Sequence, residues 1–214
     1  MNKNKITRLI VGPISTNCWI YPIGANEAAI IDPGDEADKI IFTLKKLDIA
    51  PKYILLTHGH FDHICGVPEL FVLKPKIAIH SLDSGSLGLG AYQAHRESLE
   101  SVFGDSSFLD AYWSEMPPAD ILLEEGSTIG PFTVLHLPGH SPGSAAFYDK
   151  EQKVLFTGDT LFKNGYGRTD LLNGNEAQLF ASLKRLFALD PDITVYPGHG
   201  GTTTIGQEKS GYSL

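Results

Sequence analysis

Three things are scarce in this chain: cysteine, long apolar runs and runs of one charge. Cysteine occurs only at Cys18 and Cys65, which is far too few for a disulfide scaffold and favours reduced thiols. No apolar stretch approaches the roughly 20 residues that cross a membrane. Behind the basic start, the apolar run at 9–11 is too short for a signal peptide. We therefore expect a cytoplasmic protein that does not enter the membrane.

The charge balance is acidic without being concentrated in one place. Charged residues make up 20% of the 214 residues, and the net charge is −8 with neutral histidines. Such a surface disfavours binding to nucleic acid. It is compatible with a small anionic substrate, because a local basic pocket can oppose the global field. With 42% hydrophobic residues the chain can build one sizeable core, so we expect a single domain over residues 1–214.

Short apolar runs between Gly, Pro and Asn predict strands, and apolar stripes with helical spacing predict helices. Strands are expected at 6–11, 18–21, 28–32, 53–57, 76–80, 132–136, 145–148, 154–157 and 193–196, helices at 35–47, 67–73, 92–103 and 176–189, and an aromatic loop at 108–118. Strands followed by a helix occur twice, which favours an α+β fold of two sheets packed face to face with helices outside. A single open α/β sheet is the weaker alternative, because short turns between strands favour antiparallel hairpins.

The segment richest in chemistry is His58-Gly59-His60-Phe61-Asp62-His63. It places three imidazoles and a carboxylate within six positions, a cluster that a packed core does not tolerate unpaired. Both kinds of group are good zinc ligands. The apolar run at 53–57 predicts a buried strand directly before it. The cluster therefore lies on the turn that leaves a strand's carboxyl end, where open sheets place their sites.

Three more candidate ligands follow at a distance along the chain. His140, Asp159 and His199 each come shortly after a predicted strand, and each directly follows a glycine. Glycine lets the backbone turn sharply and leaves room around the next side chain. Taken singly, each is more commonly a surface or capping residue. Taken with the first cluster, they favour a metal site, because metal sites gather ligands from several loops.

The number of candidates predicts more than one ion. Five histidines and two aspartates are too many for a single tetrahedral zinc. They suit two ions, one held by three histidines and the other by an aspartate and two histidines, with the second carboxylate bridging. Such paired ions lie about 3.5–4 Å apart and share a hydroxide, which is a nucleophile at neutral pH because the pKa of metal-bound water is about 7.

The motif set resembles one known family. His58-x-His60-x-Asp62-His63, followed in order by Gly139-His140, Gly158-Asp159 and Gly198-His199, is similar to the metallo-β-lactamase superfamily over nearly the whole chain. The resemblance implies an αββα sandwich of two mixed sheets with metals at one edge. It implies one ion on His58, His60 and His140, a second on Asp62, His63 and His199, and Asp159 as the bridge. Zinc is the expected metal, and ligand type leaves iron and manganese open.

Within that superfamily the chain looks most like the short bacterial relatives of glyoxalase II, the hydroxyacylglutathione hydrolase. The supporting segments are 31–34, 158–162, 167–170 and 198–206. The resemblance implies hydrolysis of a small-molecule thioester or ester by the metal-bridged hydroxide, with Asp62 orienting it and Arg168 facing the substrate. The chain is short after His199, so the helical region with which full-length glyoxalase II binds glutathione is expected to be absent, and glutathione specificity stays open.

The principal alternative is oxidation. Persulfide dioxygenases contain the same motifs, with a segment close to 167–170, but use a single iron. A nuclease is disfavoured because its relatives carry a large inserted domain for RNA. An antibiotic-hydrolysing enzyme is disfavoured because those proteins are usually exported and lack a bridging carboxylate where this chain has Asp159. The oligomeric state is open.

Several single residues keep two interpretations. Asp32 either forms a turn or supports a ligand histidine, and Arg168 either binds a substrate carboxylate or pairs with Asp170. Cys65 is more plausible as a plain thiol than as a ligand. The aromatic segment 108–113 either lines the substrate mouth or packs in the core. The remaining histidines, which are expected to be structural or exposed, are His80, His95 and His136.

Overall fold

The computed structural model describes residues 5–212, apart from the side chains at positions 102, 103, 108 and 111. Two six-stranded sheets form its centre. The first has the order β1-β2-β3-β4-β5-β6, with bounds Thr7–Val11, Thr16–Gly24, Glu27–Ile31, Ala50–Leu56, Lys76–His80 and Ile121–Leu123. The second has the order β14-β13-β10-β9-β8-β7, with bounds Thr203–Thr204, Thr194–Pro197, Val154–Gly158, Ala145–Asp149, Phe132–His136 and Thr128–Ile129. A separate small hairpin pairs β11 (Leu161–Phe162) with β12 (Gly165–Tyr166).

Both sheets are mixed. In the first, β1, β2 and β3 pair antiparallel, whereas β3 to β6 pair parallel. In the second, only the β10–β13 pair is parallel. The helices are α1 (Ala37–Leu47), α2 (Phe61–Ile64), α3 (Val67–Leu70), α4 (Ala91–Phe103), α5 (Ser107–Tyr112), α6 (Glu176–Leu186) and α7 (Ile205–Lys209), with short 3₁₀ turns η1 (Phe71–Leu73) and η2 (Ser81–Ser86).

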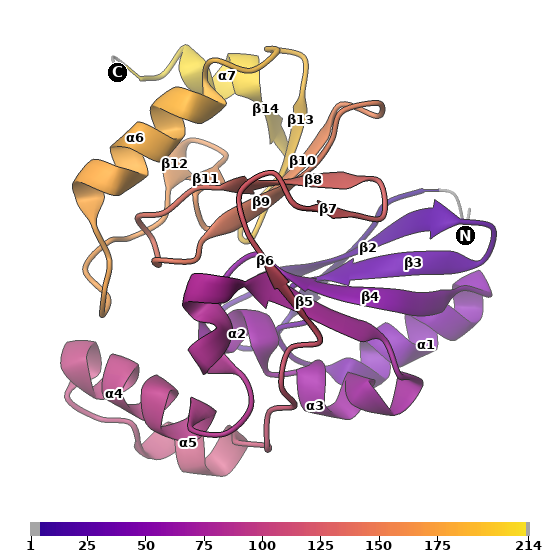
Figure 1. Ribbon diagram of the computed structural model, residues 1–214, viewed down its shortest axis with the longest axis vertical. Helices are drawn as coiled ribbons and strands as arrows, with labels where there is room; N and C mark the ends of the chain where they lie inside the picture. The colour runs from indigo at the N-terminus through magenta and orange to yellow at the C-terminus, as the bar shows by residue number, and fades with distance from the viewer. Residues whose placement is uncertain (1–4, 213–214) are drawn as a thin grey trace.

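Alternation along the strands explains the layers. On the first sheet, Ile30, Ile54 and Ile77 pack with the apolar faces of α1 and α3, while their strand neighbours face the opposite way, because successive side chains in a strand point to opposite faces. Those neighbours, Ile31, Leu55 and Ala78, pack against the aromatic face of the second sheet. The outer face of the second sheet packs against α6 (Figure 1). The predicted αββα sandwich is thus confirmed, and the single open sheet is wrong.

Some local predictions are wrong or incomplete. Part of the expected loop at 108–118 is helical, since α5 spans Ser107–Tyr112. The short strands β6, β7, β11, β12 and β14 and helix α7 were not expected from the sequence. Strands of two or three residues carry no readable alternation, and they exist because a neighbouring strand supplies hydrogen bonds.

Candidate metal centre

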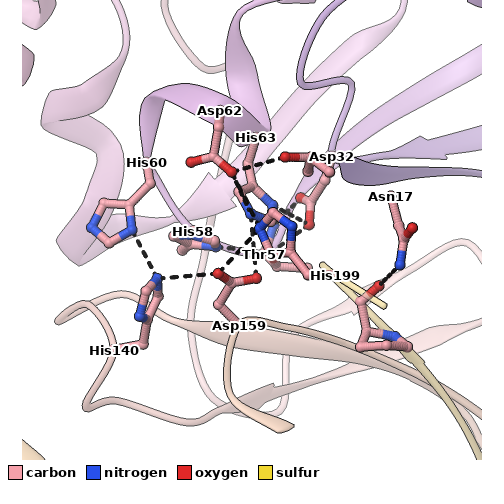
Figure 2. A network of polar contacts seen from close by, with 12 residues as sticks. Asn17, Asp32, Thr57, His58, His60, Asp62, His63, His140, Asp159 and His199 are labelled. Atoms are coloured by element: carbon pink, nitrogen blue, oxygen red, sulfur yellow. Dashed lines mark hydrogen bonds and ion pairs between the residues drawn. The ribbon is translucent and has the colours of Figure 1, made fainter. Parts of the chain in front are cut away.

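The candidate ligands come from strand ends of both sheets. His58 and His60 follow β4, and His60 is the N-cap of α2, whose first turn carries Asp62 and His63. His140 follows β8, Asp159 follows β10 and His199 follows β13. Figure 2 shows these side chains converging from the two sheets on one place. The structure therefore brings all seven residues together at one edge of the sandwich.

The donor atoms of these side chains lie close to one another. His60 Nδ1 is 2.8 Å from His140 Nε2. On the other side, His63 Nε2 is 3.2 Å from Asp62 Oδ2, and His199 Nε2 is 3.4 Å from the same oxygen. Asp159 lies between the two sides, with one carboxylate oxygen 3.3 Å from His63 Nε2 and the other 3.7 Å from His140 Nε2.

Within the part of the chain that the structure describes, three donor groups meet the geometric condition for holding an ion, with ligand atoms within 4.8 Å of one another. They are His58–His60–His140, His58–His63–Asp159 and Asp62–His63–His199. His58 Nε2, His63 Nε2 and Asp159 Oδ1 are buried and have no hydrogen-bond partner. Buried polar atoms are normally satisfied. Imidazole and carboxylate donors suit zinc, iron or manganese, so the residues present fit divalent cations.

Hydrogen bonds set the imidazole tautomers on the side of the first sheet. Asp32 Oδ2 accepts from Thr57 Oγ1 at 2.7 Å and lies 2.9 Å from His63 Nδ1. The Thr57 hydroxyl, having donated its proton to Asp32, accepts from His58 Nδ1 at 3.1 Å. Both histidines therefore keep Nε2 unprotonated when neutral, which is the form that binds a metal. The contacts show both interpretations of Asp32: its carboxylate supports a candidate ligand histidine, and its carbonyl oxygen accepts from Gly34 N at 2.9 Å in a turn.

The side of the second sheet relies on backbone groups. His140 Nδ1 donates to the carbonyl oxygen of Arg168 at 2.7 Å, which frees its Nε2. Gly198 approaches the site so closely that a Cβ there would lie 2.2 Å from Asp159 Oδ1. A side chain at this position would displace the carboxylate, so glycine is required just before His199.

Burial and neighbouring charges shift the pKa values of the candidate histidines in opposite directions. Burial, and then the neighbouring His140, lowers the pKa of His60 to about 3. Burial and the surrounding histidines likewise hold the pKa of His58 well below its usual value. Burial acts in the same direction on His63, but the carboxylates of Asp62, Asp159 and Asp32 outweigh it and raise the pKa. The imidazoles of His58 and His60 therefore favour the neutral form, whereas the imidazole of His63 favours the protonated form.

The carboxylates show the complementary shifts. Burial opposes the ionised form of Asp62, but the charge of His63 and the contact with His199 outweigh it and hold the pKa well below its usual value. The pKa of Asp159 is also lowered, again against burial and chiefly by His63. Both groups are ionised at neutral pH and retain the charge that a cation requires.

A cavity of about 1090 Å³ opens onto the donors. Its lining includes the ligand candidates His60, Asp62, His140, Asp159 and His199. Apolar and aromatic side chains form much of the remainder: Ile14, Phe61, Leu99, Tyr112, Trp113, Phe162 and Leu171. Of the predicted aromatic segment, Tyr112 and Trp113 line this cavity, while the Phe108 side chain lies outside the described residues. The cavity suits a small-molecule ligand with apolar parts.

Arg168 lies in the cavity wall, and its guanidinium forms a bidentate pair with Asp170 at 2.6 and 2.8 Å. Cys65 also lines the cavity, but none of the donor groups found among the described residues includes it, and burial raises the pKa of its thiol. Arg168 thus forms the ion pair with Asp170 that was one of its two interpretations from the sequence. Cys65 agrees with the interpretation as a plain thiol.

The three remaining histidines lie outside the donor groups found among the described residues. His80 and His95 are buried, and His95 Nε2 donates to the Ser86 carbonyl at 3.1 Å. His80 stacks on His136 with ring centroids 4.0 Å apart, which joins the ends of β5 and β8.

Sequence reasoning missed several residues that shape the site. Thr16 Oγ1 donates to Asp62 Oδ2 at 2.9 Å, and Thr57 links Asp32 to His58. Asp83 accepts hydrogen bonds from two of the ligand loops. Thr57 directly precedes the histidine cluster, and this position is a signal that could have identified it. Nothing in the sequence marks Thr16 or Asp83, which lie far from the motif.

Comparisons with known proteins agree with this architecture. A profile of the metallo-beta-lactamase superfamily matches residues 11–199. Hydroxyacylglutathione hydrolase GloC of Haemophilus influenzae is 39% identical over 199 residues, covering 90% of this chain and 89% of that protein. Among solved structures, BLEG-1 B3 metallo-beta-lactamase matches with a TM-score of 0.84 and 37% identity over 96% of this chain and 97% of the other.

TTHA1623 in a di-iron-bound form matches with a TM-score of 0.80 and 39% identity, covering 94% of this chain and 96% of that one. Among the described residues, no helix has the length and apolar character needed to span a membrane. Three observations support the same family: the profile match, the sandwich of two sheets, and the histidines and aspartates that converge at one edge of it. The chain belongs to the metallo-β-lactamase superfamily.

Proposed function

We propose that this protein is a binuclear metal-dependent hydrolase that cleaves a small-molecule thioester of the hydroxyacylglutathione type. The observation that carries the proposal is the pair of donor groups, His58–His60–His140 and Asp62–His63–His199, with the Asp159 carboxylate between them. A donor set with two separate groups and an intervening carboxylate is the arrangement expected for two ions. The 39% identity to GloC supports the thioester class.

The three histidines would hold one divalent ion, and Asp62, His63 and His199 would hold the second, with Asp159 as the shared ligand. Zinc fits the nitrogen and oxygen donors best, while iron and manganese fit them too. Divalent ions bound there would supply a water of lowered pKa and an electrophile for the carbonyl oxygen.

Asp62 is the residue that we assign a direct role beside the metal. It lines the cavity, and its lowered pKa keeps it ionised at neutral pH. An ionised carboxylate can accept a hydrogen bond from the attacking water and orient it toward the substrate carbonyl. Thr16 donates to Asp62 Oδ2 and restrains the carboxylate for this purpose.

The cavity wall would hold the remainder of the substrate. Phe61, Trp113 and Phe162 offer apolar contacts, and we assign Arg168 to a polar or carboxylate group of the substrate. Its pairing with Asp170 holds the guanidinium at the cavity wall. The thiolate that leaves needs little help from an acid, because the pKa of a thiol, about 8.5, is close to neutral.

The test joins metal analysis to a substrate panel. Protein purified without added zinc is analysed for metal, then assayed with S-lactoylglutathione and with thioesters that lack glutathione. We expect two ions per chain and thioester turnover. Turnover of other thioesters without S-lactoylglutathione would remove the glutathione part and keep the hydrolase. A single iron, with oxygen uptake on glutathione persulfide and no thioester turnover, would replace the proposal by a persulfide dioxygenase.

A further inference from the structure

Asp83 is a buried carboxylate whose hydrogen-bond partners are Gly59, Ser141 and Gly143, none of which is a candidate ligand. It lies on η2, directly after β5, and the residue is 7% exposed. Its Oδ2 accepts from Gly59 N at 3.0 Å and from Ser141 Oγ at 2.6 Å, and its Oδ1 accepts from Gly143 N at 2.6 Å. One carboxylate thus satisfies three donors, which is how a buried charge is stabilised.

Those three donors belong to two loops from different sheets. Gly59 lies between His58 and His60 on the loop after β4, while Ser141 and Gly143 follow His140 on the loop after β8. These loops carry the three histidines of the His58–His60–His140 group. The separation of the three imidazoles therefore depends on whatever joins the loops, and Asp83 joins them directly.

The packing around η2 leaves little freedom for another arrangement. A Cβ on Gly143 would lie 2.6 Å from Asp83 Cγ, and a Cβ on Gly59 would lie 2.0 Å from Ser86 Oγ. Both loops thus bring their backbones against the turn that carries Asp83, and glycine permits this approach. The close fit means that the carboxylate holds each loop at one distance.

We propose that Asp83 is a positioning residue for the His58–His60–His140 group, acting through the backbone of the two loops. The inference rests on the metal-binding part of the proposed function. It assigns one supporting carboxylate to each side of the site: Asp32 contacts His63 directly, whereas Asp83 sets the spacing of His60 Nδ1 and His140 Nε2, which lie 2.8 Å apart.

Asp83→Asn tests this with little change in shape. The amide keeps an acceptor for Gly143 N, but its NH₂ cannot accept from Gly59 N and Ser141 Oγ. Metal-free protein is titrated with Co²⁺, and uptake is followed by visible absorption and by elemental analysis. We expect one of two binding steps to weaken about 10- to 100-fold, as for other outer-sphere partners of metal ligands, with the second step unchanged.

Two control variants identify the affected step. Asp149→Asn changes another buried carboxylate, which accepts from Tyr21 Oη at 2.7 Å and lies at the end of β9 away from the site. It should leave both steps unchanged. Asp32→Asn should weaken chiefly the other step, which shows the absorption change of the carboxylate-containing group, because Asp32 contacts His63 directly and reaches His58 only through Thr57.

The inference is overturned if Asp83→Asn binds both ions as tightly as the original chain, or if both steps weaken equally. If that variant does not fold, Ser141→Ala removes one of the three donors and should weaken the same step by a smaller factor; unchanged binding there also overturns the inference. An original chain that takes up fewer than two Co²⁺ ions contradicts the proposed function as well. Two ions in the original chain and in Asp83→Asn at equal affinity contradict only the role of Asp83.

Discussion

The two sheets contribute to the site in different ways. The first supplies four ligand candidates from one continuous segment after β4, and side chains hold them: Asp32 contacts His63, and Thr16 donates to Asp62. The second supplies one ligand candidate from each of three strand ends, and backbone groups or glycines place them. Ligand candidates that are neighbours in the sequence need side-chain supports to orient them separately. Ligand candidates at different strand ends are already held apart by the sheet.

The two donor groups also differ in charge. His58 and His60 have lowered pKa values because they are buried among other imidazoles, and their group contains no carboxylate. His63 has a raised pKa because carboxylates surround it. The His58–His60–His140 group therefore consists of imidazoles alone, whereas the Asp62–His63–His199 group contains a carboxylate, so the two donor groups are chemically distinct.

The largest effect is expected at the residue between the two groups. Asp159→Ala removes the carboxylate that lies near His63 on one side and His140 on the other. Both donor groups should lose metal. Loss of a hydrogen-bond partner of a metal ligand lowers activity by up to about 100-fold, and loss of the shared carboxylate itself should lower it further. Elemental analysis and circular dichroism would separate metal loss from unfolding. A variant with two ions per chain and full thioesterase activity would contradict the assignment.

The next effect tests the side-chain support of the first sheet. Asp32 has a φ of 51°, a left-handed conformation that asparagine also tolerates, so Asp32→Asn changes the chemistry and keeps the backbone. The amide has one acceptor oxygen, so it cannot accept from His63 Nδ1, Thr57 Oγ1 and Thr57 N together, as the two carboxylate oxygens do. Metal affinity of the Asp62–His63–His199 group should fall about 10- to 100-fold. Unaltered two-step metal binding would show that the support is dispensable, and Asp149→Asn serves as the matched buried control.

A smaller effect tests the backbone support of the second sheet. Arg168→Ala removes the guanidinium but leaves the carbonyl that accepts from His140. Metal content should therefore stay unchanged. Because the side chain is 46% exposed, its contact with a substrate carboxylate should contribute about 1 kcal/mol, which corresponds to a roughly fivefold higher KM at unchanged kcat. Loss of metal from this variant would mean that the side chain, and not the carbonyl, supports His140.

The smallest effect concerns an exposed ion pair on the outside of the second sheet. Arg185 on α6 pairs with Glu125, and this hydrogen bond lowers the pKa of Glu125. Both side chains are 43–50% exposed, so Glu125→Gln should lower the free energy of unfolding by about 0.5 kcal/mol at neutral pH.

A carboxylate with a lowered folded-state pKa stabilises the protein above its unfolded value, here 4.5, and loses that contribution as the pH falls through the folded value. The difference between Glu125→Gln and the original chain should therefore vanish in acid, as urea unfolding at several pH values would show. Metal binding should be unchanged, because this pair does not reach the site. A pH-independent difference would indicate lost packing instead of lost charge.

The sequence predicted the larger elements well because their patterns are long. The strand before His58 is marked by a continuous apolar run and helix α6 by an apolar stripe with helical spacing, and both are present. The region around α5 was misjudged because Pro and aromatic residues dominate it, and a six-residue helix has too few turns to show a period. Two-residue strands such as β7 and β11 exist only through their partners.

All seven ligand candidates were recognisable from residue type, from glycine neighbours and from position after predicted strands, because metal chemistry restricts the side chains that can serve. That His140, Asp159 and His199 meet the first cluster was decided by the tertiary structure, since the pairing and packing of two sheets bring their strand ends to one edge. The supports Thr16 and Asp83 were invisible in the sequence, because their roles are hydrogen bonds to distant loops. The sequence thus determined which atoms are available to a metal, and the fold decided which of them lie within reach of one another, because distances between remote segments are set by packing and not by order along the chain.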